Sequence, residues 1–158
     1  MIRYLLLGSA FMLASTVTFA TSANAQEATA SGMVATSCDF KNPQRGDLIL
    51  NSGGTALTSV GGTPAKVDID CNGDATLTIS APKQVKGPSN PLEFTNLTAT
   101  ATSTKLGLNV SSGGTPGNIF ANSEGDAIGT IEVNMVANKG SKITPGEYEF
   151  TVTLTSTP

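Results

Sequence analysis

The last quarter of the chain carries the clearest alternation of apolar and polar positions. Between residues 148 and 154 every second residue is large and apolar, namely Tyr148, Phe150, Val152 and Leu154. A period of two is typical of a strand that buries one face and exposes the other. Residues 127–139 alternate in the same way, and a turn segment with Pro145-Gly146 separates the two runs. We therefore predict two strands here, each with one buried face.

Shorter alternating runs recur along the rest of the chain, and segments rich in Gly and Pro separate them. We predict strands at residues 30–38, 47–50, 66–71, 75–80, 92–100 and 105–110. Residues 40–46 are expected to form a connection and residues 51–64 a loop, and the prolines at 82, 88 and 91 are expected to break regular structure. No window shows sustained helical spacing. This pattern predicts an all-β chain, folded as an immunoglobulin-like antiparallel β-sandwich.

The N-terminal segment has the features of a secretory signal. Arg3 gives it a short basic start, residues 4–20 are almost uncharged, and Ala23-Asn24-Ala25 matches the small-x-small cleavage site. The alternative is a retained membrane anchor, but polar residues at positions 15, 16 and 18 interrupt the apolar run. We therefore predict a signal peptide over residues 1–25 and a single exported domain over residues 26–158.

Export decides how the two cysteines are interpreted. Cys38 and Cys71 both lie beyond the predicted cleavage site, and an oxidising compartment favours one disulfide between them. Such a bond closes a loop of about 34 residues, which is worth on the order of 4 kcal/mol in the chain-entropy model. A redox-active pair would instead favour a Cys-x-x-Cys spacing, and that spacing is absent. We predict a structural disulfide.

Charge and composition argue against several classes of function. Loss of Arg3 with the signal leaves eight Lys and Arg against twelve Asp and Glu, a net charge of −4 without basic clusters, so we expect no nucleic-acid partner. The chain has no His, which removes Ser-His and Cys-His nucleophile pairs and imidazole metal ligands. It also has no Trp to stack on a sugar. We predict a protein that is not an enzyme, with no cofactor and no evident small-molecule substrate.

Two acidic motifs resemble functional sites, but each is better explained as part of an exposed strand face. The run Asp68-x-Asp70-x-Asn72-Gly73 resembles the start of a calcium loop, but its twelfth position is Ile79 instead of a bidentate Glu. Glu147 and Glu149 share one strand face, as paired catalytic carboxylates would, yet a solvated strand face explains them better. We therefore predict no metal site and no catalytic residue.

Three features together resemble the pilin superfamily assembled by chaperone and usher, including its spore coat protein U-like branch. Gly32-x-Val34 leads to Cys38, as in the pilin first strand, and Val67-x-Ile69-x-Cys71 closes an alternating strand about thirty residues later. The third feature is the ending, in which a strand, a Pro-Gly turn and an alternating terminal strand follow one another.

The resemblance implies a fimbrial or surface-coat subunit that functions in cell adhesion. Its sandwich would lack the final strand, and the resulting groove would be filled first by a periplasmic chaperone and then by the N-terminal extension of a neighbouring pilus subunit at the outer-membrane usher. Carried onto this chain, the groove and chaperone edge strand is Tyr148, Phe150, Val152 and Leu154. The donor segment is Ala28, Ala30, Gly32 and Val34.

A second hypothesis belongs to another class of function. The chain would be a self-contained secreted or periplasmic β-sandwich that binds a ligand through its Gly-rich loops and does not polymerise. In that case the runs at residues 127–139 and 147–155 would simply pair within a complete sandwich.

Overall fold

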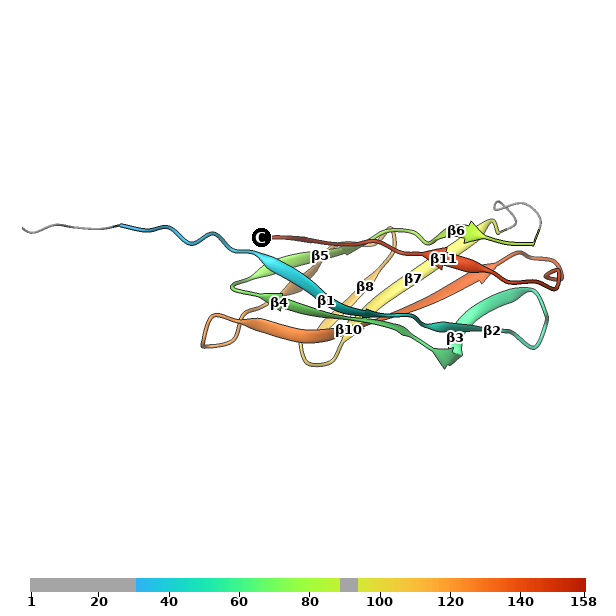
Figure 1. The fold of residues 1–158 in the computed structure, drawn as a ribbon, viewed down its shortest axis with the longest axis horizontal. Coiled ribbons are helices and arrows are strands. Elements are labelled where there is room, and N and C mark those ends of the chain that lie inside the picture. The colour runs from blue at the N-terminus through green and yellow to red at the C-terminus, as the bar shows by residue number, and fades with distance from the viewer. Residues whose placement is uncertain (1–30, 89–93) are drawn as a thin grey trace, which may run out of the picture. The chain divides into compact units, whose positions relative to one another are not determined.

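The computed structural model describes residues 31–88 and 94–158, and Figure 1 shows its fold. The predicted signal peptide, together with Ala28 and Ala30 of the predicted donor segment, lies outside these residues. The description below concerns the body formed by residues 34–158. The described residues contain no helix that is long and apolar enough to cross a membrane.

The described part of the body is built from strands. In chain order they are β1 (Cys38–Gln44), β2 (Asp47–Leu50), β3 (Ala56–Thr63), β4 (Ala65–Cys71), β5 (Ala75–Ile79), β6 (Lys83–Lys86), β7 (Asn96–Ser103), β8 (Leu108–Ser111), β9 (Gly117–Ile119), β10 (Ala127–Asn138), β11 (Glu149–Thr151) and β12 (Leu154–Thr157). All the pairings between them are antiparallel. The prediction of an all-β chain is confirmed.

The first layer is centred on β10. One edge of β10 pairs with β4 and then with β3, and its other edge pairs with β7, which in turn pairs with β8. Outside β4 and β3 lie β1 and β2, which follow each other in the chain. Across the layer, β1 and β2 form one edge, β4 and β3 lie next to them, and β10, β7 and β8 follow.

The second layer contains the C-terminal run. Here β11 pairs with β6, and β12 pairs with β5, whose other edge pairs with β9. At the break between the two short sheets, Ser80 N–H donates to the Thr153 carbonyl (2.9 Å) and Thr153 N–H donates to Ser80 Oγ (2.9 Å), so contact between the strands continues. The C-terminal run thus pairs with β5 and β6, whereas β10 pairs with β4, β3 and β7.

The apolar faces of the two layers meet in one core. Ile69 and Ile131 from the first layer, and Leu77 and Ile119 from the second, are completely buried in it. Phe94 packs edge-on against Tyr148 and Phe150, with ring centroids 5.4 and 5.3 Å apart. Figure 1 shows β5, β6 and β11 on one side of the body and β4 and β10 on the other, a sandwich-like arrangement.

The predicted disulfide is confirmed. Cys38 and Cys71 are bonded and stand directly opposite each other in the pairing of β1 with β4, with Cα atoms 4.0 Å apart. The bond joins the first residue of β1 to the last residue of β4, and so ties an edge strand to its neighbour.

Several strand boundaries differ from the sequence predictions. The first strand starts at Cys38, not at residue 30, and residues 40–46, predicted as a connection, form most of β1. The polar residues of β1 are tolerated because most of its side chains are exposed at the edge. A pairing irregularity between Lys41 and Gln44, where Asn42 has φ 52°, interrupts the alternation that would have marked a strand.

Two further segments predicted as irregular are strands. Residues 51–64 were predicted to be a loop, but β3 occupies most of the segment. Gly61 and Gly62, which suggested a loop, lie where β3 bends against β2. Gly61 has φ 83°, and a Cβ on Gly62 would overlap the Asp47 carbonyl, so both positions favour glycine. Likewise β6 fits between Pro82 and Pro88 as a short partner of β11.

The aromatic cluster gives a test of the core. Phe94 is 7% exposed and lies against two rings, so Phe94→Ala should lower the free energy of unfolding by about 3–5 kcal/mol. Phe120 is 67% exposed, and Phe120→Ala serves as the control, with an expected loss of less than about 1 kcal/mol. Urea unfolding of both variants measures the difference. Equal losses would contradict the packing described here.

Candidate functional site

The candidate site is the gap between two strand edges that have no partner among the described residues. In the first layer β1 pairs only with β4, and in the second layer β11 and β12 pair only with β6 and β5. Each edge carries a row of backbone N–H and C=O groups that a further strand would satisfy. The two edges border the same groove, so one strand placed there would lie beside both of them.

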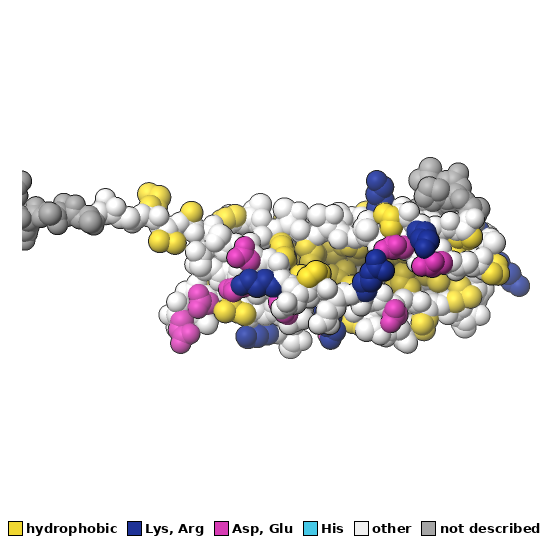
Figure 2. Space-filling view, in the orientation of Figure 1, with side chains coloured by type: hydrophobic (Ala, Val, Ile, Leu, Met, Phe, Trp, Pro, Cys, Tyr) yellow, Lys and Arg dark blue, Asp and Glu magenta, His cyan; other side chains and the backbone are white. Residues whose placement is uncertain are grey.

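The groove has a volume of about 990 Å³ and a largely apolar lining. Figure 2 shows it as a continuous apolar strip between white and charged surfaces. Both layers contribute large side chains that are half-buried and pack against the core, namely Leu48, Leu57, Val67, Val133, Tyr148, Phe150, Val152 and Leu154. The groove is thus a side of the hydrophobic core that the described chain leaves uncovered.

The alternation of the C-terminal run determines which of its side chains face the groove. Tyr148, Phe150, Val152 and Leu154 line the groove and are half-buried, as their period of two predicts, while the intervening Thr151 and Thr153 lie at its margin and are exposed. The sequence therefore identified the second-layer wall correctly.

The sequence analysis missed the wall formed by the first layer. Leu57 lies in a segment predicted to be a loop, and Leu48 lies in a strand of only four residues. Val133 and Met135 carried a usable signal, because they alternate with polar residues in β10. The sequence could show that these residues point inward but not that they face an uncovered part of the core.

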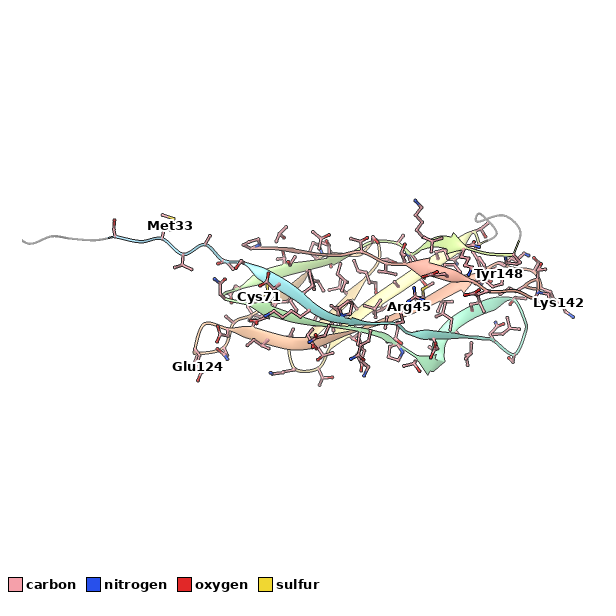
Figure 3. The ribbon with its side chains drawn as sticks, viewed as in Figure 1. Met33, Arg45, Cys71, Glu124, Lys142 and Tyr148 are labelled. Atoms are coloured by element: carbon pink, nitrogen blue, oxygen red, sulfur yellow. A yellow bond between two sulfur atoms is a disulfide. The ribbon has the colours of Figure 1, made fainter. Side chains whose placement is uncertain are left out.

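One ion pair links the two walls. Arg45, in the connection between β1 and β2, places Nη2 2.7 Å from Glu149 Oε1 on β11. Figure 3 labels Arg45 and Tyr148 in the same half of the body, where this pair lies. The Arg45 side chain is 88% exposed, so the pair contributes little to stability. It is a contact between the walls that an inserted strand would have to pass beneath or displace.

A second ion pair lies beside the groove. Lys86 Nζ is 2.7 Å from Glu147 Oε2. The hydrogen bond from Lys86, and then its positive charge, lower the pKa of Glu147, and the same contacts raise the pKa of Lys86. Glu147 and Glu149 thus have different cationic partners, Lys86 and Arg45.

The segment that leads into β1 is clamped by Asn72. Ser37 N–H donates to Asn72 Oδ1 (2.7 Å), Asn72 N–H donates to the Ser37 carbonyl (3.1 Å), and Asn72 Nδ2 donates to the Ala35 carbonyl (3.2 Å). A Cβ on Gly73 would lie 3.0 Å from Thr36 Cγ2 and Oγ1, so glycine permits this close approach. Residues 35–37 are therefore fixed to the turn between β4 and β5.

The carboxylates of the calcium-like motif have partners on the outer face of β4. Asp70 pairs with Lys41 at 2.7 Å, and Asp68 accepts from Asn42 (3.0 Å) and Thr130 (2.7 Å). The two hydrogen bonds to Asp68 lower its pKa. The described residues hold no group of three or more His, Cys, Asp or Glu side chains that could bind a metal ion.

The structure does not place the predicted donor segment in a groove. Val34, the last of its residues, is 86% exposed. Gly32 is described but lies in a separate segment from the body, and Ala28 and Ala30 lie outside the described residues. The donor role of these four residues remains a prediction.

Comparison with known proteins gives no further information. No family model matches the chain, and neither a curated protein nor a solved structure matches it.

The clamp predicts a local change in backbone protection. Asn72→Ala removes both side-chain contacts, so the Ser37 amide should exchange with deuterium at least about tenfold faster, while amides in β10 keep their rates. Asn109→Ala, on the exposed face of β8, is the control. An unchanged Ser37 rate in Asn72→Ala would show that the clamp does not hold the segment.

The Glu147 pair predicts a pH dependence. Lys86→Gln should raise the Glu147 pKa towards its ordinary value of 4.5, whereas Lys83→Gln on the same strand should leave it unchanged. Because the folded-state pKa is lowered, the pair stabilises the fold above the ordinary pKa, and this contribution disappears as the pH falls through the lowered value. NMR titration of the Glu147 carboxyl chemical shift measures the Glu147 pKa in both variants. A Glu147 pKa that is the same with and without Lys86 would refute the assignment.

Proposed function

We propose that this chain is an exported structural subunit of a fimbria or surface coat that is assembled by strand donation between chains. The groove between β1 and the C-terminal run is the observation that carries the proposal. It combines what such assembly requires: two backbone edges without partners and an apolar interior exposed between them.

The strand order supports interpreting the body as an immunoglobulin-like sandwich without its last strand. One layer runs from the edge formed by β1 and β2 through β4 and β3 to β10 and β7, and the other places β11 and β12 beside β6 and β5. A strand added along β11 and β12 would complete the second layer and cover the open core. It would also bury apolar area, at roughly 25 cal/mol per Å².

The partners follow from that interpretation. A periplasmic chaperone would lend a strand during export, the outer-membrane usher would assemble the subunits, and a neighbouring subunit would supply the permanent strand. The Cys38–Cys71 disulfide is compatible with an oxidising compartment on this route. The alternative, a self-contained binding module, requires that the body is stable without any added strand.

Expression with and without a chaperone separates these two functions. The chain produced alone in the periplasm should aggregate or be degraded, and co-expression with its cognate chaperone should give a soluble complex. Deletion of residues 26–31 should leave that complex intact and abolish fibres. A monomer that folds cooperatively with no partner would contradict the proposal and favour the binding module.

Single substitutions on the two faces of the C-terminal run test the groove directly. Val152 lines the groove, so Val152→Asp should abolish chaperone co-purification and fibre formation, because it buries a charge beneath the added strand. Thr155 is exposed and is not among the residues that line the groove, so Thr155→Asp should preserve both activities. Similar yields of complex from the two variants would show that strand donation does not occur in this groove.

A further inference from the structure

We propose that the strand filling this groove comes from a different chain, not from a second copy of this one, and that it carries large apolar side chains at alternate positions. This inference rests on the proposed function and specifies the chemistry of the partner.

The walls of the groove define what the inserted strand must provide. A strand placed along β11 and β12 points every second side chain into the core. There it meets Leu48, Val67 and Met135 from one layer and Phe150 and Val152 from the other. The body's own groove-facing strand supplies large apolar residues at four successive inward positions, at residues 148, 150, 152 and 154. Comparable filling requires side chains of similar size.

The chain's own N-terminal arm, residues 26–34, does not supply large apolar side chains in either strand register. One alternating set is Ala28, Ala30, Gly32 and Val34, with one branched residue, and the other is Glu27, Thr29, Ser31 and Met33, with one long apolar residue. Full burial of a Leu or Ile side chain strengthens association by roughly tenfold or more. Three small residues at successive inward positions therefore lower the affinity on the order of a thousandfold, relative to three large apolar residues at the same positions.

The length of the arm does not explain the mismatch. The Asn72 clamp holds residues 35–37 to the body, so a chain cut before Gln26 would have residues 26–34 ahead of the clamp. Nine extended residues span about 30 Å, enough for a long strand. The limitation is the size of the side chains, so this arm suits a shallower groove than the one in its own body. The chain is then one member of an assembly that contains more than one kind of subunit.

The test supplies candidate strands in cis. The mature full-length chain is extended after Pro158 by a short Gly/Ser linker and a nine-residue strand, because β12 ends at Thr157 beside the start of β5 and the linker can turn back into the groove. One version carries residues 26–34 unchanged, and a second carries the same residues with A28I, A30I and G32I in the appended copy. A third ends after the linker. Thermal unfolding and resistance to proteolysis are measured for all three.

The expected result is a soluble, protease-resistant product with a cooperative thermal transition for the isoleucine strand, whereas the linker-alone chain aggregates or is degraded and the unchanged arm gives a much smaller gain. Val152→Asp should abolish the gain, which shows that the strand acts in the groove. Equal stabilisation by the two strands would overturn the inference and leave the proposed function standing. No stabilisation by either strand would overturn both, because the groove would then accept no strand.

Discussion

The structure depends on a constraint that applies to every β-layer: a strand at its edge has backbone groups without partners, and its apolar face needs a covering neighbour. In this chain both needs arise at the same place. The edge of β1 and the edge of β11 and β12 border one groove, and the side chains between them are the outer margin of the core. Exposure of this apolar margin to water is unfavourable, which is the basis of our proposal that a further strand covers it.

Other contacts secure the walls of that groove. Among the described residues β1 pairs with β4 alone, and the Cys38–Cys71 bond fastens its first residue to that neighbour. Just before this bond, Asn72 holds residues 35–37. At the other end of β1, Arg45 reaches Glu149 on the opposite wall. An edge strand that cannot rely on two flanking strands is thus held by covalent, hydrogen-bonded and ionic contacts.

The arm and the groove differ in a way that bears on assembly. The arm leaves the body from a fixed base, and its residues are small, whereas the groove is lined by large apolar side chains from both layers. Backbone pairing alone does not discriminate between donors, because every strand offers the same groups. Under the proposed strand donation, the discrimination would come from side-chain volume, so the identity of the donor would be a question of packing.

The sequence by itself determined the strands whose faces differ in polarity. β10, β4, β5 and the run from Tyr148 to Leu154 were recognised, and their inward residues were assigned correctly, because alternation is a local property of a half-buried strand. The disulfide followed from there being only two cysteines in a predicted exported chain. β1, β3, β6 and β9 were missed, since edge exposure, glycines and flanking prolines hide the same pattern. Only the tertiary structure decided which inward faces meet and which remain uncovered, because that depends on pairing between segments far apart in the chain.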